Sequence, residues 1–187
     1  MTELRIPILE PSEGIARART KWQHTGAQRP DFAEEPTEGQ RSVWDFPRPP
    51  CIRPVTEVLR VFHEKTPVAE TRRGVCVEET AGAPTYYFPP GDVDMDLVTF
   101  GDLASICEWK GVAQTLSVCG VADAGWRYVK MFEEFQALFE WPAFYPGKLL
   151  CFVGKELVQP QPGGYYGGWV TSDLAGPIKG APDSQGW

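Results

Sequence analysis

Short apolar runs, separated by polar residues and by glycine or proline, dominate the chain between residues 55 and 88. Their β-branched and aromatic residues, with turn-forming residues between them, are typical of strands joined by hairpins. The pattern therefore predicts strands over 58–62, 67–70, 75–79 and 85–88, with turns at 63–66 and 81–84.

The second half of the chain continues this pattern. It predicts further strands over 112–118, 149–153 and 156–158. Apolar side chains recur at helical spacing over 131–141, and Pro142 would end a helix there. A shorter helix is predicted over 14–22. Because strands dominate, the sequence predicts a mainly β fold: a compact, single, β-rich domain with one or two short helices.

The composition changes near residue 42. Residues 1–41 are rich in Glu, Arg, Pro and Gly and lack a long apolar periodicity, so we predict a flexible N-terminal extension. The segment 42–50 combines two aromatic residues with three prolines, which favour extended backbone. We therefore predict that the ordered domain spans 42–187, a length that suits one domain.

Composition and charge exclude several classes of protein. A net charge of -7 argues against nucleic-acid binding, which depends on Lys and Arg neutralising phosphates. No stretch approaches the roughly 18 apolar residues of a membrane helix, and residues 1–10 lack the features of a secretory signal. Five widely spaced cysteines without a C-x-x-C pair are typical of reduced thiols. We expect a soluble cytoplasmic protein without nucleic-acid or membrane partners.

Cys107 and Lys110 form the first candidate site. They lie three residues apart, so on a helical turn both could face one way, and the ammonium could activate the thiol as a nucleophile. The alternative is a buried cysteine beside a lysine that forms a salt bridge. Only two histidines, His24 and His63, are present as bases, which argues against Cys-His or Ser-His-Asp hydrolysis.

Three carboxylates at alternate positions, Asp92, Asp94 and Asp96, are the nearest approach to a metal motif. On a strand they would share one face and could hold a divalent cation. A solvated strand face is the commoner meaning of such a row. We therefore predict no metal site, with these three residues as the weak candidates.

Aromatic residues beside glycines suggest a pocket. The run 163–169 is rich in glycine and aromatics but lacks the G-x-x-x-x-G-K-[ST] phosphate loop. Glycines of this kind let backbone and rings approach a planar ligand or the core closely. The candidate ligand-binding residues are Trp44, Lys110, Trp126, Tyr145, Tyr166, Trp169 and Lys179. The alternative is that the aromatic residues among them fill the interior of a β domain.

Five segments resemble the DUF427 family, a domain family of unknown function. They are 42–50 (SVWDFPRPP), 86–93 (YYFPPGDV), 107–111 (CEWKG), 143–145 (AFY) and 166–171 (YGGWVT). The resemblance implies a compact, mostly β domain and carries no settled activity. A nucleotidyltransferase label sometimes given to this family has no support in these residues. Leu116, where an aromatic residue is common, and Glu108 depart from the family pattern.

Two hypotheses of function follow. The first is a domain that binds a small molecule in an aromatic-lined pocket, with Lys110 or Lys179 engaging an anionic or carbonyl group. This hypothesis includes an enzyme of unknown reaction and unknown cofactor. The second is a protein-interaction module that uses exposed Trp and Tyr anchors. A homodimer is compatible with both. An enclosed cavity near Lys110 would favour the first hypothesis, and an outward aromatic patch the second.

Overall fold

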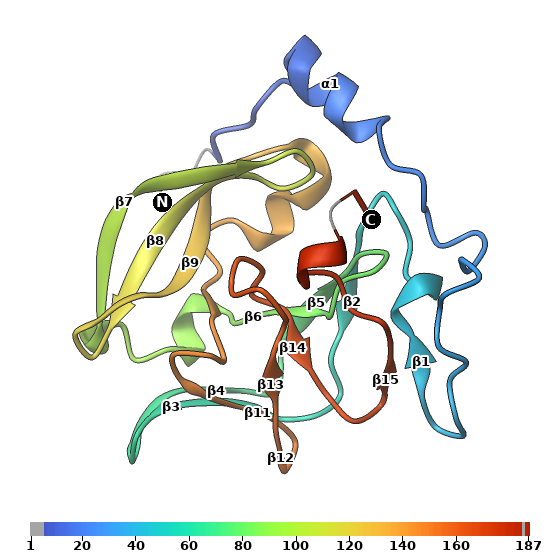
Figure 1. Cartoon of the computed structure of the whole chain (residues 1–187). Helices are drawn as coiled ribbons and strands as arrows, with labels where there is room; N and C mark the ends of the chain where they lie inside the picture. Colours follow the sequence, from blue (N-terminus) through green and yellow to red (C-terminus); the bar gives the residue numbers. More distant parts are fainter. Residues whose placement is uncertain (1–5, 185) are drawn as a thin grey trace.

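Antiparallel hairpins between neighbouring segments build most of the protein, as the short strand-forming runs require (Figure 1). The computed structural model describes residues 6–184 and 186–187. The prediction of a mainly β, single-domain fold is confirmed. No helix among the described residues is long and apolar enough to cross a membrane.

The longest strands form an antiparallel sheet in the order β10-β9-β8-β7, at the left of Figure 1. Its members are β7 (Val98–Cys107), β8 (Gly111–Val118), β9 (Val121–Met131) and β10 (Ala143–Phe144). The sequence predicted β8 but missed β7 and β9. Most of β7 is exposed along its length, so its side chains show no buried alternation to signal a strand.

The hairpins predicted in the first half of the chain are present. A second four-stranded sheet has the order β12-β11-β3-β4, with members β3 (Leu59–His63), β4 (Thr66–Thr71), β11 (Leu150–Val153) and β12 (Glu156–Leu157). A three-stranded sheet contains β2 (Cys51–Pro54), β5 (Val75–Glu78) and β6 (Thr85–Tyr87). Two short pairs complete the strands: β1 (Arg41–Ser42) with β15 (Leu174–Ala175), and β13 (Gln159–Pro160) with β14 (Trp169–Val170).

Helical segments are short. They are α1 (Glu13–Arg19), η1 (Val43–Asp45), η2 (Pro90–Asp92), η3 (Met95–Leu97), η4 (Glu133–Leu138) and η5 (Pro182–Ser184). The helix predicted over 131–141 forms only as the 3-10 helix η4, because Met131 still belongs to strand β9. Phe135 and Leu138 are its buried residues, and their spacing of three matches the 3-10 period as well as the α period.

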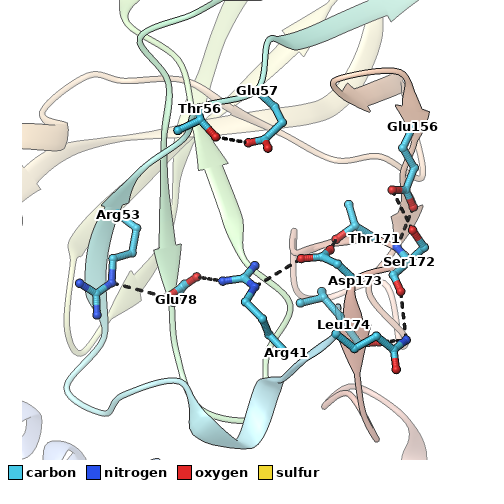
Figure 2. A network of polar contacts seen from close by, with 11 residues as sticks. Arg41, Arg53, Thr56, Glu57, Glu78, Glu156, Thr171, Ser172, Asp173 and Leu174 are labelled. Carbon is cyan, nitrogen blue, oxygen red and sulfur yellow. Dashed lines mark hydrogen bonds and ion pairs between the residues drawn. The ribbon is translucent and has the colours of Figure 1, made fainter. Parts of the chain in front are cut away.

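A network of ion pairs joins distant parts of the chain (Figure 2). Glu78 at the end of β5 is nearly buried and pairs with Arg41 of β1 and with Arg53 of β2. Arg41 also pairs with Asp173, next to β15. Charged side chains therefore fix the parallel β1–β15 pair against the three-stranded sheet, whereas the ladder joins only β1 and β15 to each other.

The N-terminal segment lies against the largest sheet. The Leu9 amide donates to the Met131 carbonyl at 2.7 Å, and the Met131 amide donates to Pro7 at 3.0 Å. Arg19, at the end of α1, donates through Nε to the Glu108 carbonyl at 2.7 Å and stacks over the Phe132 ring. These contacts hold the N-terminal segment beside the β7–β8 turn. That residues 1–41 form a flexible extension stays a prediction.

Candidate functional site

A pocket of about 760 Å³ lies between the largest sheet and the β5–β6 hairpin. Strands β8 and β9 contribute one wall, through Ala113, Thr115, Gly125, Trp126 and Tyr128. The β5–β6 hairpin contributes the facing wall, and loops at 145–148 and 164–167 border the space. This volume is within the range of small-molecule sites.

Lys110 lies in the turn between β7 and β8 and lines the pocket. It is 9% exposed, and its Nζ lies 3.9 Å from Glu79 Oε2, beyond hydrogen-bond distance. Burial alone lowers the pKa of Lys110, but the nearby Cys107, Tyr87, Glu79 and Glu108 act against it and together raise this pKa above its usual value. The side chain is therefore a charged ammonium at neutral pH.

Glu79 is shared between two cations. Its Oε1 accepts from Arg48 Nε at 3.3 Å. The remaining nitrogens of Arg48 donate to the carbonyls of His24 and Thr80, both at 2.9 Å. The Arg48 guanidinium is thus fully engaged inside the protein, which leaves Lys110 as the less satisfied cation of this group.

Tyr87 faces Lys110 from strand β6. Its side chain is fully buried, and its hydroxyl has no hydrogen-bond partner among the described residues. Burial raises the pKa of Tyr87 to about 12, against the opposing influence of the nearby Lys110 charge. A neutral hydroxyl that lines a pocket without a partner is a ready donor to a ligand or to water.

Trp126 provides the largest aromatic surface of the β9 wall. Its ring lies 4.6 Å from that of Tyr145, centroid to centroid, and 6.5 Å from that of Tyr87. The loop 164–167 reaches the ring because Gly167 has no side chain: a Cβ at Gly167 would lie 2.0 Å from Trp126 Cη2. The glycine-rich run therefore allows the backbone at Gly167 to approach the Trp126 ring closely, as the composition of the run predicts.

Trp22 closes one side of the pocket from the N-terminal segment, and no sequence pattern indicates this role. Its ring lies between two cations, with Arg48 Cζ at 4.1 Å and Lys179 Nζ at 4.2 Å from the ring centre. Its indole Nε1 is buried without a hydrogen-bond partner. Lys179 also lies over the Tyr166 ring and donates to the Trp187 carbonyl at 2.8 Å. Burial lowers the pKa of Lys179, and the positive Arg48 nearby acts in the same direction.

Cys107 and Lys110 share the pocket, although they do not lie on a helical turn. Cys107 ends β7 and pairs with Gly111 across the hairpin, so a tight β turn brings the two side chains to the same space. The thiol donates to Glu108 Oε2 at 3.9 Å. Neither histidine lines the pocket, so the thiol has no imidazole base there.

Two of the predicted ligand-binding residues lie outside this pocket. Trp44 and Trp169 are fully buried and belong to separate core clusters. Their indole nitrogens donate to the carbonyls of Pro177 at 3.2 Å and of Phe144 at 2.9 Å. The pocket does bring together Cys107, Lys110, Trp126, Tyr145, Tyr166 and Lys179.

The three aspartates do not form a strand face. Asp92 ends η2 and Asp96 lies in η3, so the alternating geometry expected of a strand is absent. Asp92 instead accepts from Thr71 and Arg73, both at 2.6 Å, and Asp94 caps η3. Within the described ranges, no three His, Cys, Asp or Glu residues lie close enough to hold a metal ion.

Fold and pocket together define a mainly β, single-domain protein with a ligand-sized cavity. The chain belongs to the family described as a domain of unknown function (DUF427), whose model matches residues 51–155. No curated protein matches the chain.

The family match covers only part of the pocket wall. Tyr87, Lys110 and Trp126 lie within residues 51–155, whereas Trp22 and Lys179 lie outside this range. The wall contributed by Tyr87, Lys110 and Trp126 is therefore part of the matched domain, while flanking segments close the pocket in this chain.

Proposed function

We propose that this protein binds a small organic molecule in the pocket between the largest sheet and the β5–β6 hairpin. One observation carries the proposal: a cavity of about 760 Å³ has aromatic walls, and two of its lining residues, Trp22 and Tyr87, have buried polar atoms without a hydrogen-bond partner among the described residues. Concave, mostly apolar pockets with a few convergent polar groups are the usual form of ligand sites.

The burial of the tryptophans supports this proposal over an interaction module. Trp44 and Trp169 have no exposed surface, and Trp126 is 8% exposed. Tryptophans buried in this way are not available as anchors for a protein partner. Tyr165 is exposed, but it borders the pocket, where it suits a rim residue.

An exposed apolar row on β7 is the feature that most resembles an interaction surface. Phe100, Leu103 and Ile106 are exposed, and Ile106 also borders the pocket. The ladder between β7 and β8 is irregular on both sides of Leu103, and such bulges interrupt the flat edge that strand pairing needs. Arg127 also lies over the Phe100 ring, at 3.8 Å from its centre. The apolar row on β7 is therefore weaker evidence for partner binding than the pocket is for ligand binding.

The polar groups of the pocket suit binding better than nucleophilic catalysis. The raised pKa of Lys110, caused by the surrounding acidic groups, keeps its nitrogen protonated, so it donates hydrogen bonds and does not attack carbonyl carbon. Tyr87, with a pKa of about 12 because of burial, likewise keeps its proton. Both groups are donors that can orient a ligand.

Native mass spectrometry tests the proposal. The protein, purified gently from its natural source, is compared before and after denaturation, together with Lys110→Ala and the exposed, matched control Lys130→Ala. We expect a small mass that leaves on denaturation and is retained by Lys130→Ala but not by Lys110→Ala. A protein that carries no such mass, and that no member of a compound library stabilises against heat, would contradict the proposal.

A further inference from the structure

The charge of the pocket differs from that of the whole chain. The chain has a net charge of -7. The pocket is lined by four cationic residues (Arg48, Lys110, Lys148 and Lys179) and three acidic ones (Glu79, Glu108 and Asp123). An acidic protein that keeps a net positive charge around its main cavity favours a negatively charged occupant there.

Most of these cations already have partners. Arg48 is engaged by Glu79 and two carbonyls. Lys148 donates to the Ala122 carbonyl and Lys179 to the Trp187 carbonyl, both at 2.8 Å. Lys110 differs, because its ammonium forms no hydrogen bond with any described residue and its Glu79 contact is 3.9 Å long. Because no described protein group accepts a hydrogen bond from this ammonium, it can donate to an anionic ligand oxygen in the pocket.

Tyr87 adds a second donor from the opposite wall. Its hydroxyl is buried and has no hydrogen-bond partner among the described residues, and its side chain lines the same pocket as Lys110. One ammonium in the β7–β8 turn and one neutral hydroxyl on β6 can donate to the two oxygens of one acidic group.

The polar groups of the pocket favour a carboxylate over a phosphate. Phosphate sites usually combine several backbone N–H groups, a helix N-terminus or a free arginine fork. Each nitrogen of Arg48, the pocket's arginine, already donates to a protein group, and Glu79 and Glu108 would repel a dianion more strongly than a monoanion. A ligand with one negative charge matches Lys110, whose ammonium donates no hydrogen bond to a described residue.

The aromatic walls indicate the rest of the ligand. Four aromatic side chains line the cavity: Trp22, Trp126, Tyr145 and Tyr166. Planar rings pack favourably against such surfaces by stacked or edge contacts. We propose that the ligand is a planar aromatic monocarboxylate whose oxygens accept hydrogen bonds from Lys110 Nζ and Tyr87 Oη. This inference rests on the proposed function and names the ligand class for the same pocket.

Isothermal titration calorimetry of the full chain with three matched probes tests the inference. The probes are 2-naphthoate, its neutral isostere 2-naphthamide, and 2-naphthyl phosphate. We expect 2-naphthoate to bind about tenfold or more tightly than either of the others, because a charge-assisted hydrogen bond contributes a factor of about this size.

Matched variants assign the effect to the two donors. Lys110→Met should weaken 2-naphthoate binding about tenfold or more, and Tyr87→Phe by a smaller factor. The controls are Lys130→Met, an exposed lysine of the same sheet, and Tyr86→Phe, the neighbour of Tyr87 that packs in a different core cluster. Neither control should change the affinity. If Lys110→Met does not fold, Tyr87→Phe and the carboxylate-to-amide ratio on the unmodified chain decide the question.

The outcomes separate this inference from the proposed function. Equal binding of the amide, tighter binding of the phosphate, or a Lys110→Met affinity equal to that of Lys130→Met would overturn the carboxylate while leaving a ligand pocket in place. A co-purified ligand without an acidic group would do the same. Failure of all three probes, in a protein that also carries no co-purified mass, would overturn both.

Discussion

At the scale of single residues, the tryptophans of this chain have two different roles. Trp126 lines the pocket together with Lys110. Trp44 and Trp169, for which the sequence predicts the same role, are fully buried in other clusters. Tryptophan composition predicts large buried surfaces, but only the fold decides whether a ring faces a cavity or the core.

The contact of Gly167 with Trp126 gives a prediction at this scale. We expect Gly167→Ala to destabilise the protein by about 1–3 kcal/mol and to weaken ligand binding, because the new methyl group would overlap the indole ring and displace it or the loop. Urea unfolding and the tryptophan emission spectrum measure the effect. Gly91→Ala is the matched control, since a Cβ there meets nothing within 4 Å. Equal stability of the two variants would show that the loop does not press on the ring.

At the scale of elements, sequence patterns predicted the hairpins and missed strands that lack a pattern. The segments 58–62 and 67–70 match β3 and β4 closely because each is a short run with buried apolar residues between turn-forming residues. Strand β7 is exposed along most of its length, so its side chains carry no alternation to detect. The aspartate row likewise depended on an assumed strand, and prolines and caps at 90–97 produce two 3-10 helices instead.

The junction of β4 with η2 gives a prediction about pH. Hydrogen bonds from Thr71, and then from Arg73, lower the pKa of Asp92 below its usual 3.8. A lowered folded-state pKa stabilises the protein above the unfolded-state pKa, and this contribution is lost as pH falls through the folded-state pKa. We therefore expect Asp92→Asn to cost about 1 kcal/mol at pH 7, and the difference from the unmodified protein to shrink below about pH 4.

Urea unfolding at a series of pH values from neutral to acidic measures this difference. Asp96→Asn is the matched control, because Asp96 is exposed and accepts no hydrogen bond from another described side chain. A destabilisation by Asp92→Asn that persists unchanged in acid would mean that the lost charge is not its cause.

At the scale of the whole molecule, residues near both ends of the chain contribute to the pocket, together with residues of the matched range 51–155. The family model matches 51–155, but Trp22 and Lys179 close the pocket, and Arg41 ties β1 to both β5 and the segment next to β15 (Figure 2). These contacts span most of the chain length. Local sequence patterns carry no signal for them, which is why the first 41 residues read as an extension without a role in the site.

Arg19 tests whether the N-terminal segment supports the pocket. Its guanidinium donates to the Glu108 carbonyl, in the turn that carries Lys110, and lies over the rings of Trp109 and Phe132. We expect Arg19→Ala to destabilise the protein by about 1–3 kcal/mol and to speed hydrogen exchange of the turn amides over 108–111. Ligand affinity should fall as well, because Lys110 would lose its fixed position.

The matched control is Arg17→Ala, an exposed arginine in the last turn of the same helix. Both changes remove one positive charge near the same helix end. Any effect that the two variants share is therefore caused by the loss of this charge from the helix end. An effect confined to Arg19→Ala would show that the segment positions the turn, and through it the Lys110 ammonium. Equal behaviour of the two variants would instead mean that the domain forms its pocket without support from this contact, and the N-terminal segment would then support the site through Trp22 and through the His24 carbonyl that accepts from Arg48.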